Sequence, residues 1–366
     1  MVSQYKKIGI PLLDNNDNRV LLIPDDIKHL IKNGFEITIT ASAGLKAGYT
    51  NKDYKEAGAE IVLENTGLKN CDLLIMPSIK KNDFYKNFEN IDILSLIDND
   101  DKFKENENRN IKNWLNLSTF KKNGLYITQE KQDFLAGQFL FYLVQGNQSL
   151  NSGILFSKIP GIETPKILFI GNSFFCKGFL KEILKTDCEI TYIDNDYDRL
   201  GALQNEYGNR VNSIFFNSEN FIKKLKESDI VICAGITNEI IRQSDINNMK
   251  RNSLFIDSDF TNNLVDIKRE KNFYIHNNIK HYISNAVNLN QSILKTSSLH
   301  LSIIITDFLL KPDIYSFKYV YENNSLLADY KKAETKIDKN NLNKLLDNDS
   351  DDSDISWLDI EDNKDY

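Results

Sequence analysis

Cysteine, proline and histidine are scarce in this sequence of 366 residues, which contains four, six and four of them. No CxxC pair is formed by the four cysteines, Cys71, Cys176, Cys188 and Cys233. This pattern excludes a zinc site built on cysteine pairs and a disulfide framework, so we expect buried, reduced thiols. No spacing of His, Cys and carboxylates indicates a metal site.

Long apolar runs are also missing. No stretch approaches the ~20 apolar residues that a membrane span needs. The first residues, MVSQYKKIGIPLL, lack the basic start, apolar stretch and small-residue cleavage site of a secretory signal. We therefore expect a cytoplasmic protein without a membrane partner. The hydrophobic content of 41% predicts a folded chain, and its length predicts two domains.

The sequence has no basic excess of the kind that nucleic-acid binding requires. Its formal net charge is −7, and residues 347–366 hold nine acids and one lysine, which leaves the remainder near +1. We therefore expect no nucleic-acid partner. Residues 345–366 are interpreted as a solubilising acidic tail, or alternatively as a short motif that docks on a basic protein partner. The alternative rests on four apolar side chains among the acids: Ile355, Trp357, Leu358 and Ile360.

Short apolar runs alternate with helical stretches over the first hundred residues. The runs at 6–10, 35–40 and 72–76 predict strands. The stretch after Pro24 predicts a helix, because proline followed by two acids suits a helix start and Gly34 suits its end. The polar segment 98–113 is expected to be a solvated loop or a solvated helix face. This order of elements predicts a parallel α/β unit.

A second alternating series follows a predicted helix over 133–146. Its expected strands are 166–171, 189–194, 213–216, 229–235, 253–259 and 281–287, and a helix over 295–310 is expected to fold back on the first domain. The predicted fold class is α/β, with two Rossmann-like doubly wound domains and a cleft between them. The expected domains are a substrate-type domain (1–132 and 291–325), a dinucleotide-binding-type domain (133–290) and a disordered acidic tail (326–366).

The segment FIGNSFFC, residues 169–176, stands where an α/β protein carries its dinucleotide-binding turn. Only Gly171 of the three expected glycines is present, and Ser173 and Cys176 replace the others. The second glycine lets the backbone approach the pyrophosphate and the third allows close helix packing. A serine Cβ and the bulk of Phe174 and Phe175 narrow this space. We therefore expect weak or altered nucleotide binding.

Asp194 ends the second strand of this domain, 23 residues after Gly171. That is close to the spacing at which an acidic side chain accepts hydrogen bonds from the adenosine ribose. A carboxylate there favours NAD over NADP, because it repels a 2′-phosphate. The alternative is an aspartate that caps the next helix, a role that Asp196 and Asp198 suit equally well.

Three segments resemble the family of alanine dehydrogenases and pyridine nucleotide transhydrogenases, which includes some saccharopine and opine dehydrogenases. They are 7–62, with its NRV and AG…AG motifs, 153–171, and 281–302. The resemblance implies NAD on the second domain and a small amino or oxo acid on the first. Hydride would pass between C4 of the nicotinamide and the carbon bearing the amino group. It also implies an oligomer, of this chain alone or with a relative.

The same resemblance implies substrate-binding roles for two residues. Arg19 of DNNDNRV stands where the family's arginine binds a substrate carboxylate, for which a planar guanidinium offers two parallel donors. The alternative is a surface arginine in a polar loop. Asn285 of HYISNAV is retained as well, although the proline and glycine residues that usually follow it are not.

The family's proton-transfer positions are substituted. An ungapped comparison places its lysine at Ser78, its histidine at Ile97, its glutamate at Phe134 and its aspartate near Thr261. Serine and isoleucine do no acid/base work near neutral pH.

Two hypotheses follow from these substitutions. The first is an active NAD-dependent amino acid dehydrogenase of the alanine or saccharopine/opine type, with a general acid supplied by Lys80, Lys81 or His281. The second is a noncatalytic paralogue that serves as a binding or assembly module.

Overall fold

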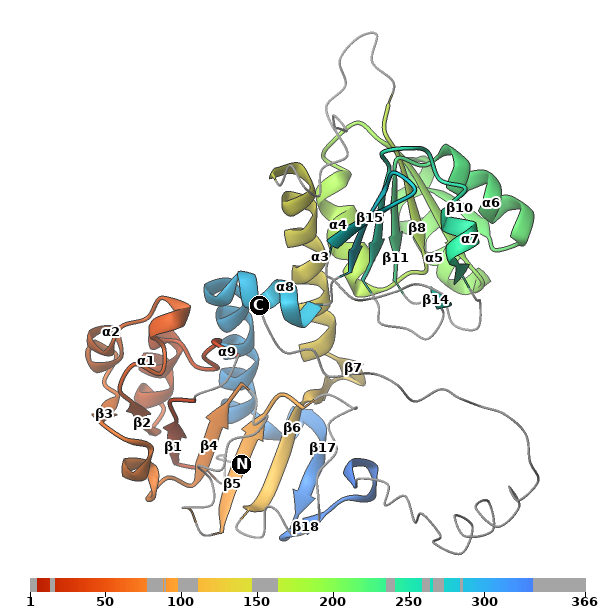
Figure 1. The fold of residues 1–366 in the computed structure, drawn as a ribbon. Helices are drawn as coiled ribbons and strands as arrows, with labels where there is room; N and C mark the ends of the chain where they lie inside the picture. The colour runs from red at the N-terminus through yellow and green to blue at the C-terminus, as the bar shows by residue number, and fades with distance from the viewer. Residues whose placement is uncertain are drawn as a thin grey trace, which may run out of the picture.

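The computed structural model describes residues 5–13, 17–77, 88, 90–97, 111–146, 164–234, 241–258, 264–265, 273–283 and 286–331. These residues form two lobes, each built on one central sheet (Figure 1). The helix α3 (Thr128–Gly146) runs from the last strands of the first lobe into the second. The expected α/β class with two parallel-dominated sheets is therefore confirmed.

The sheet of the first lobe is parallel in its middle and antiparallel at one edge. Its order is β18 (Ser325–Leu326), β17 (Tyr315–Glu322), β6 (Ile111–Lys122), β5 (Ile91–Ser95), β4 (Leu73–Met76), β1 (Lys7–Ile10), β2 (Glu36–Thr40) and β3 (Glu60–Val62), with β7 (Leu125–Tyr126) beside β6. β17 pairs antiparallel with β6, so a strand from beyond residue 310 completes a sheet that begins at residue 7.

Two helices cover one face of this sheet. α1 (Pro24–Lys32) begins at its proline with acids in the first turn, and Gly34 ends the turn beyond it in a left-handed conformation. Its buried Ile27 and Leu30 join the core that α9 (Leu294–Leu310) also contacts. The C-terminal helix thus returns to the first lobe, as the sequence predicted. α2 (Asn51–Glu56) follows Thr50, which caps it.

The second lobe has a seven-stranded sheet that is parallel except at one edge. Its order is β10 (Asn212–Phe215), β9 (Glu189–Asp194), β8 (Lys166–Ile170), β11 (Ile230–Cys233), β13 (Leu254–Asp257), β16 (Ile279–Ile283) and β15 (Phe273–His276). Its helices are α4 (Phe174–Ile183), α5 (Tyr197–Tyr207), α6 (Ser218–Glu227) and α7 (Gln243–Ile246). Two apolar clusters lie on the two faces of this sheet, as expected of a doubly wound domain.

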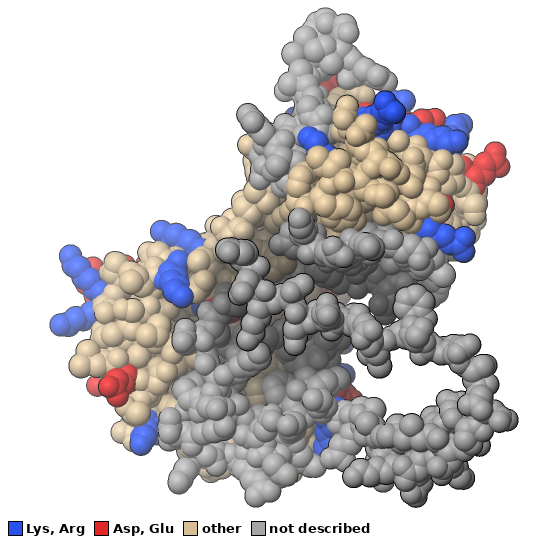
Figure 2. Space-filling view, in the orientation of Figure 1, with Lys and Arg blue, Asp and Glu red and all other residues tan. Residues whose placement is uncertain are grey.

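The remaining elements are short. β12 (Ile241–Arg242) pairs with β14 (Leu264–Val265), and α8 (Ala286–Ser292) precedes α9. Short 3₁₀ helices are η1 (Leu45–Ala47), η2 (Asn65–Leu68), η4 (Gly208–Arg210), η5 (Pro312–Ile314) and η6 (Ala328–Tyr330). In the view of Figure 2, charged side chains of both signs lie toward the outer ends of the two lobes.

Two element predictions need correction. Residues 111–113 of the expected loop begin the twelve-residue strand β6, whose pairing with β5 and β17 outweighs its polar composition. The expected strand 281–287 ends at Ile283, and a helix starts at Ala286. β18 and the 3₁₀ turn after it belong to the first lobe. The proposed docking motif at 345–366 lies outside the described residues.

The two helices α3 and α4 cross with their backbones in contact. A Cβ on Gly137 would overlap the carbonyl oxygen of Phe175, and one on Gly178 would overlap that of Phe134. Beside this crossing, the buried carboxylate of Glu182 on α4 accepts hydrogen bonds from Gln138 and Tyr142 of α3 and from Lys185, two residues after α4. The close crossing packs α3 against the second lobe. The same helix also contacts α8, α9 and β6.

Candidate functional site

A cavity of about 150 Å³ lies at the carboxyl edge of the first sheet. The strand order reverses between β1 and β4, and open α/β sheets bind ligands at the carboxyl ends of strands beside such a switch point. Residues that follow both strands contribute to the cavity. It is lined by Ile10, Pro11, Leu12, Leu13, Asp17, Asn18, Arg19, Val20, Leu21, Ser42, Ala43, Leu45, Lys46 and Pro77.

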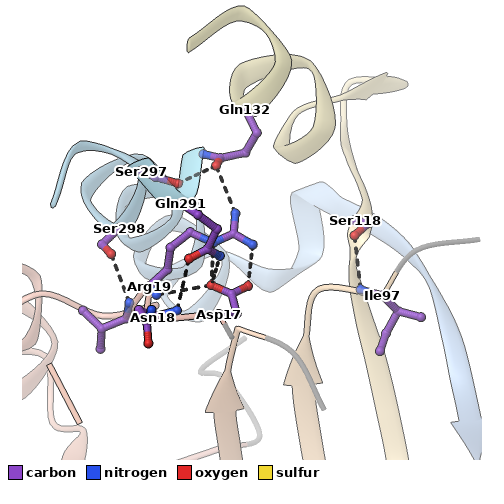
Figure 3. Close-up of polar contacts among 10 residues, drawn as sticks. Asp17, Asn18, Arg19, Ile97, Ser118, Gln132, Gln291, Ser297 and Ser298 are labelled. Atoms are coloured by element: carbon purple, nitrogen blue, oxygen red, sulfur yellow. Dashed lines mark hydrogen bonds and ion pairs between the residues drawn. The ribbon is translucent and has the colours of Figure 1, made fainter. Parts of the chain in front are cut away.

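Arg19 is held in this cavity wall by Asp17. The Nη2 atom of Arg19 lies 2.6 Å from Oδ2 of Asp17, and Nε lies 2.9 Å from Oδ1, so the pair is joined at two points (Figure 3). Both side chains are buried, with 5% and 11% of their surface exposed. The interpretation of Arg19 as a surface arginine is therefore wrong.

Three further polar residues surround this pair. The Oε1 atom of Gln132, on α3, accepts hydrogen bonds from Nη1 of Arg19 and from the hydroxyl of Ser297, on α9. The side-chain amide of Gln291 donates to Asp17 and accepts from the backbone N–H of Asn18. Because α3, α8 and α9 meet at this point, the orientation of Arg19 depends on the junction of the two lobes (Figure 3).

The arrangement leaves donors available. Each Nη of Arg19 carries a second hydrogen, and among the described residues neither of these is used. The Nε2 atom of Gln132 is buried and has no hydrogen-bond acceptor among the residues that the structure describes. Since a buried donor without a partner costs about 1–3 kcal/mol, this group of N–H donors is suited to an anionic acceptor.

Asp17 remains ionised at neutral pH. Burial favours its protonated form, but the hydrogen bonds and positive charge of Arg19, with the amide of Gln291, outweigh burial and hold the pKa of Asp17 below its ordinary value. The ion pair therefore carries both charges, and they cancel within the cavity wall.

The turn between β8 and α4 has the conformation of a dinucleotide-binding loop in one respect. Gly171 has φ of +83°, which a side chain would disfavour. Ser173 is the N-cap of α4, and its hydroxyl accepts a hydrogen bond from the N–H of Cys176 at 3.2 Å. That N–H is one of those a phosphate would contact at a helix N-terminus.

The two phenylalanines after Ser173 have different environments. Phe175 is buried in the core of the second lobe, so the expectation that it adds bulk beside the helix N-terminus is wrong. Phe174 is 38% exposed, with the ammonium of Lys177 over its ring. Cys176 is fully buried, and the close helix approach is made two residues later, at Gly178.

Asp194 lies at the end of β9 and is buried. Its Oδ1 accepts from the N–H of Asp196 and lies 3.2 Å from Nη2 of Arg199, while Oδ2 has no hydrogen-bond partner among the described residues. Burial raises the pKa of Asp194, and Arg199 opposes this effect. Asp196, not Asp194, caps α5 by accepting from the N–H groups of Asp198 and Arg199. The capping interpretation therefore belongs to Asp196.

His281 lies on β16 of the second sheet, 1% exposed, with its ring stacked on that of Tyr274 at 4.6 Å. Burial, with a smaller effect of His276, lowers the pKa of His281 to about 4. Its Nε2 has no partner within the described chain. It is separate from the Arg19 group, which joins the first sheet to α3 and α9.

Some of the site residues predicted from the sequence lie outside the residues that the structure describes. Lys80, Lys81 and Asn285 lie outside the described residues, as do Ser78 and Thr261. Ile97, at the carboxyl end of β5, is buried, and its N–H donates to the side chains of Asn116 and Ser118. Phe134 lies on α3 near Lys181.

None of the four cysteines forms a disulfide; Cys176 and Cys233 are buried, as expected, and Cys71 and Cys188 are only partly so. Within the described residues, no group of three or more His, Cys, Asp or Glu is placed to hold a metal ion. None of the helices that can be examined is long and apolar enough to cross a membrane.

Sequence reasoning missed several of these contacts. Asp17 stands two residues before Arg19, a spacing that signals a local pair in a loop. Gln132, Gln291 and Ser297 are more than 100 residues from Arg19, and only folding brings them together.

Known proteins match both lobes. Residues 13–94 match the alanine dehydrogenase/PNT N-terminal domain, and residues 142–336 match the C-terminal domain of the same name. An alanine dehydrogenase 2 of Staphylococcus aureus is 25% identical over 341 residues, covering 88% of this chain and 91% of the relative. A solved L-alanine dehydrogenase superposes with a TM-score of 0.72 at 17% identity, over 88% of this chain and 96% of that one. A transhydrogenase from Sinorhizobium meliloti gives 0.70 at 13% identity, over 88% and 99%.

Proposed function

The chain belongs to the alanine dehydrogenase/PNT family, and from this premise we propose that it is an oxidoreductase that uses a nicotinamide nucleotide, NAD, and acts on a small amino or oxo acid. The observation that carries the proposal is the buried Arg19, fixed by Asp17 at the switch point of the first sheet, with N–H donors still available. The named relatives are alanine dehydrogenases, which supports a substrate of this class.

In this proposal Arg19 binds the substrate carboxylate through its remaining Nη hydrogens. Gln132 fixes the guanidinium plane through Oε1 and offers Nε2 as a further donor. Charge-assisted, two-point hydrogen bonds fix orientation as well as affinity. Asp17 holds the other edge of the guanidinium, so Arg19 needs no rearrangement when substrate arrives. We propose Asn285 as a second contact to the substrate, and Lys80 or Lys81 as the proton donor, since Pro77 of the cavity precedes them closely in the chain.

The second lobe would hold the nucleotide. Gly171 supplies the turn, Ser173 lies at the helix N-terminus, and the unpartnered Oδ2 of Asp194 is suited to accept a ribose hydroxyl. These residues fit a nicotinamide nucleotide. The Ser173 hydroxyl accepts from the N–H of Cys176, which a phosphate would otherwise contact. When bound, the nicotinamide supplies the site that takes or gives hydride. We propose the two domains expected from the sequence, a substrate-type domain and a dinucleotide-binding-type domain, with α3 as their junction.

A noncatalytic role is the second candidate. The buried Ile97 and the half-buried Phe134 support it, because neither side chain transfers protons and the ungapped comparison places both where the family uses titratable groups. In that case the protein serves as a binding or assembly module, as an oligomer of this chain or with a relative.

Calorimetric titration with NAD and NADH tests the proposal first, with Asp194→Asn as the matched variant. Micromolar binding that the substitution weakens supports a nucleotide site. NADH oxidation with a 2-oxo acid and ammonia then tests turnover. Binding without turnover for any 2-oxo acid favours the noncatalytic role, and a folded protein that binds neither nucleotide contradicts the oxidoreductase.

A further inference from the structure

One charged residue in the lining of the cavity at the first sheet has no oppositely charged partner among the described residues. Its charged lining residues are Asp17, Arg19 and Lys46. The first two form the buried pair described above, and their charges cancel. Lys46 makes no ion pair with any described residue, so the described lining residues have a net positive charge that comes from Lys46.

The loop that presents Lys46 is fixed by packing. Ala47 is buried, and a Cβ on Gly44 would meet the ring of Tyr54, so the backbone lies directly on that ring. The Tyr54 hydroxyl in turn donates to the carbonyl oxygen of Leu22 at 3.1 Å. Gly48 closes η1 in a left-handed conformation. Lys46 therefore projects from a loop of defined shape, while its flexible side chain can adjust to a ligand.

The rest of the cavity lining is largely apolar. It includes Ile10, Pro11, Leu12, Leu13, Leu21 and Leu45. An apolar wall with charged groups placed along it suits a ligand with a short hydrocarbon body and an acidic group at each end. A substrate as small as alanine, held by its carboxylate on Arg19, would leave Lys46 without an acceptor.

We propose that Lys46 is a specificity-determining residue that binds a second carboxylate, so that this site takes a 2-oxo or 2-amino dicarboxylic acid in preference to alanine or its oxo acid. The proposal rests on the proposed function, because it assigns the first carboxylate to Arg19. The opposite charges match, and the apolar wall contacts the methylene groups between the two carboxylates.

The test compares two oxo acids of equal chain length, 2-oxoglutarate and 2-oxopentanoate, which differ in the second carboxylate. Each is measured by NADH oxidation with ammonia and by calorimetry on the full-length protein. Lys46→Ala and Lys46→Glu are compared with Lys28→Ala, which removes an exposed lysine of α1 away from the cavity lining. We expect the unmodified protein to prefer 2-oxoglutarate by about tenfold or more, the range of a hydrogen bond to a charged group. Lys46→Ala should abolish this ratio and Lys46→Glu should reverse it.

The two proposals fail in different ways. Turnover of both acids with a ratio that Lys46→Ala leaves unchanged overturns the role of Lys46 and leaves the oxidoreductase standing. Binding of 2-oxoglutarate that Lys46→Ala abolishes, without turnover of either acid, supports Lys46 and contradicts the oxidoreductase. Absence of both binding and turnover in a folded protein overturns both.

Discussion

The carboxylate of Asp17 holds the guanidinium of Arg19 at two points, with 2.6 Å between Oδ2 and Nη2 and 2.9 Å between Oδ1 and Nε. The pair is buried where α3, α8 and α9 meet the first sheet. An internal acid thus orients a cation that belongs to the lining of a cavity. The stability of this pair and the affinity of the cavity for acids are therefore linked.

Replacing Asp17 by Asn should destabilise the protein most at neutral pH. The substitution leaves the Arg19 charge buried without its partner, a loss of about 3–5 kcal/mol. Because the folded-state pKa of Asp17 is lowered, its stabilisation is present above the unfolded pKa and is lost as the pH falls through the folded pKa. Urea unfolding at pH 7 and pH 3 should show a large difference from the unmodified protein that shrinks in acid. The exposed Asp25→Asn is the control, and an equal difference at both pH values would contradict the assignment.

His281 predicts a second pH effect, in a different window. Its pKa of about 4 lies below that of an unfolded histidine, near 6.5, so between these values the unfolded state binds more protons. Stability should therefore fall as the pH drops from about 6.5 to 4, by up to about 1.4 kcal/mol per pH unit from this group. His281→Phe, which keeps a ring against Tyr274, should flatten the curve. The exposed His29→Gln should not, and a curve unchanged by His281→Phe would show that other groups cause the slope.

The α3–α4 crossing predicts opposite effects of the same substitution at different glycines. Gly137→Ala and Gly178→Ala force the two backbones apart and should each cost about 2–4 kcal/mol, as overpacking of a tight contact does. Gly201→Ala, in the exposed middle of α5, has nothing near its Cβ and should stabilise by about 0.5–1 kcal/mol. Thermal unfolding measures all three. Unfolding temperatures that Gly137→Ala and Gly178→Ala leave unchanged would mean that the crossing tolerates separation.

Ser173→Gly should strengthen nucleotide binding if the proposed site is correct. The substitution removes the hydroxyl that accepts from Cys176 and frees that N–H for a phosphate. Loss of the cap itself should cost only a few tenths of a kcal/mol. NADH affinity by calorimetry should rise about threefold to tenfold, an effect of roughly 1 kcal/mol. Asn217→Gly removes the equivalent cap of α6 and should leave affinity unchanged. Equal affinities in both variants would show that the hydroxyl does not compete.

Local sequence patterns predicted the elements that local chemistry determines. The start of α1 at Pro24, the end of β9 at Asp194 and the return of α9 follow from capping, alternation and helical periodicity. The strand β6 was missed because its IKNWLNLSTFKK pattern mixes polar and apolar residues, and its partners β5 and β17 are about 20 and 200 residues away. Strand formation there depends on pairing that no short window contains.

Some residues of the candidate site could be predicted from the sequence, and others only from the fold. Arg19 and Asp194 were found because a motif or a spacing surrounds them. The neutralisation of Arg19 by Asp17 and the orientation by Gln132 required three-dimensional contacts. No sequence pattern indicated a binding role for Lys46, because an isolated lysine in a loop is ordinarily solvated. Its position in the cavity lining is the observation that suggests one.

The pairing of β17 with β6 delays completion of the first sheet while the chain is being synthesised. Tyr321 on β17 stacks on Trp114 of β6, with ring centroids 6.1 Å apart and both rings fully buried. The first sheet therefore stays unfinished on the ribosome until the whole second lobe has been made. Until then β6 presents an open edge and an uncovered tryptophan, which is a hazard for association between nascent chains. The strands of the second sheet follow one another in the chain, so the second lobe can fold before β17 and β18 are made. These two strands then complete the sheet of the first lobe.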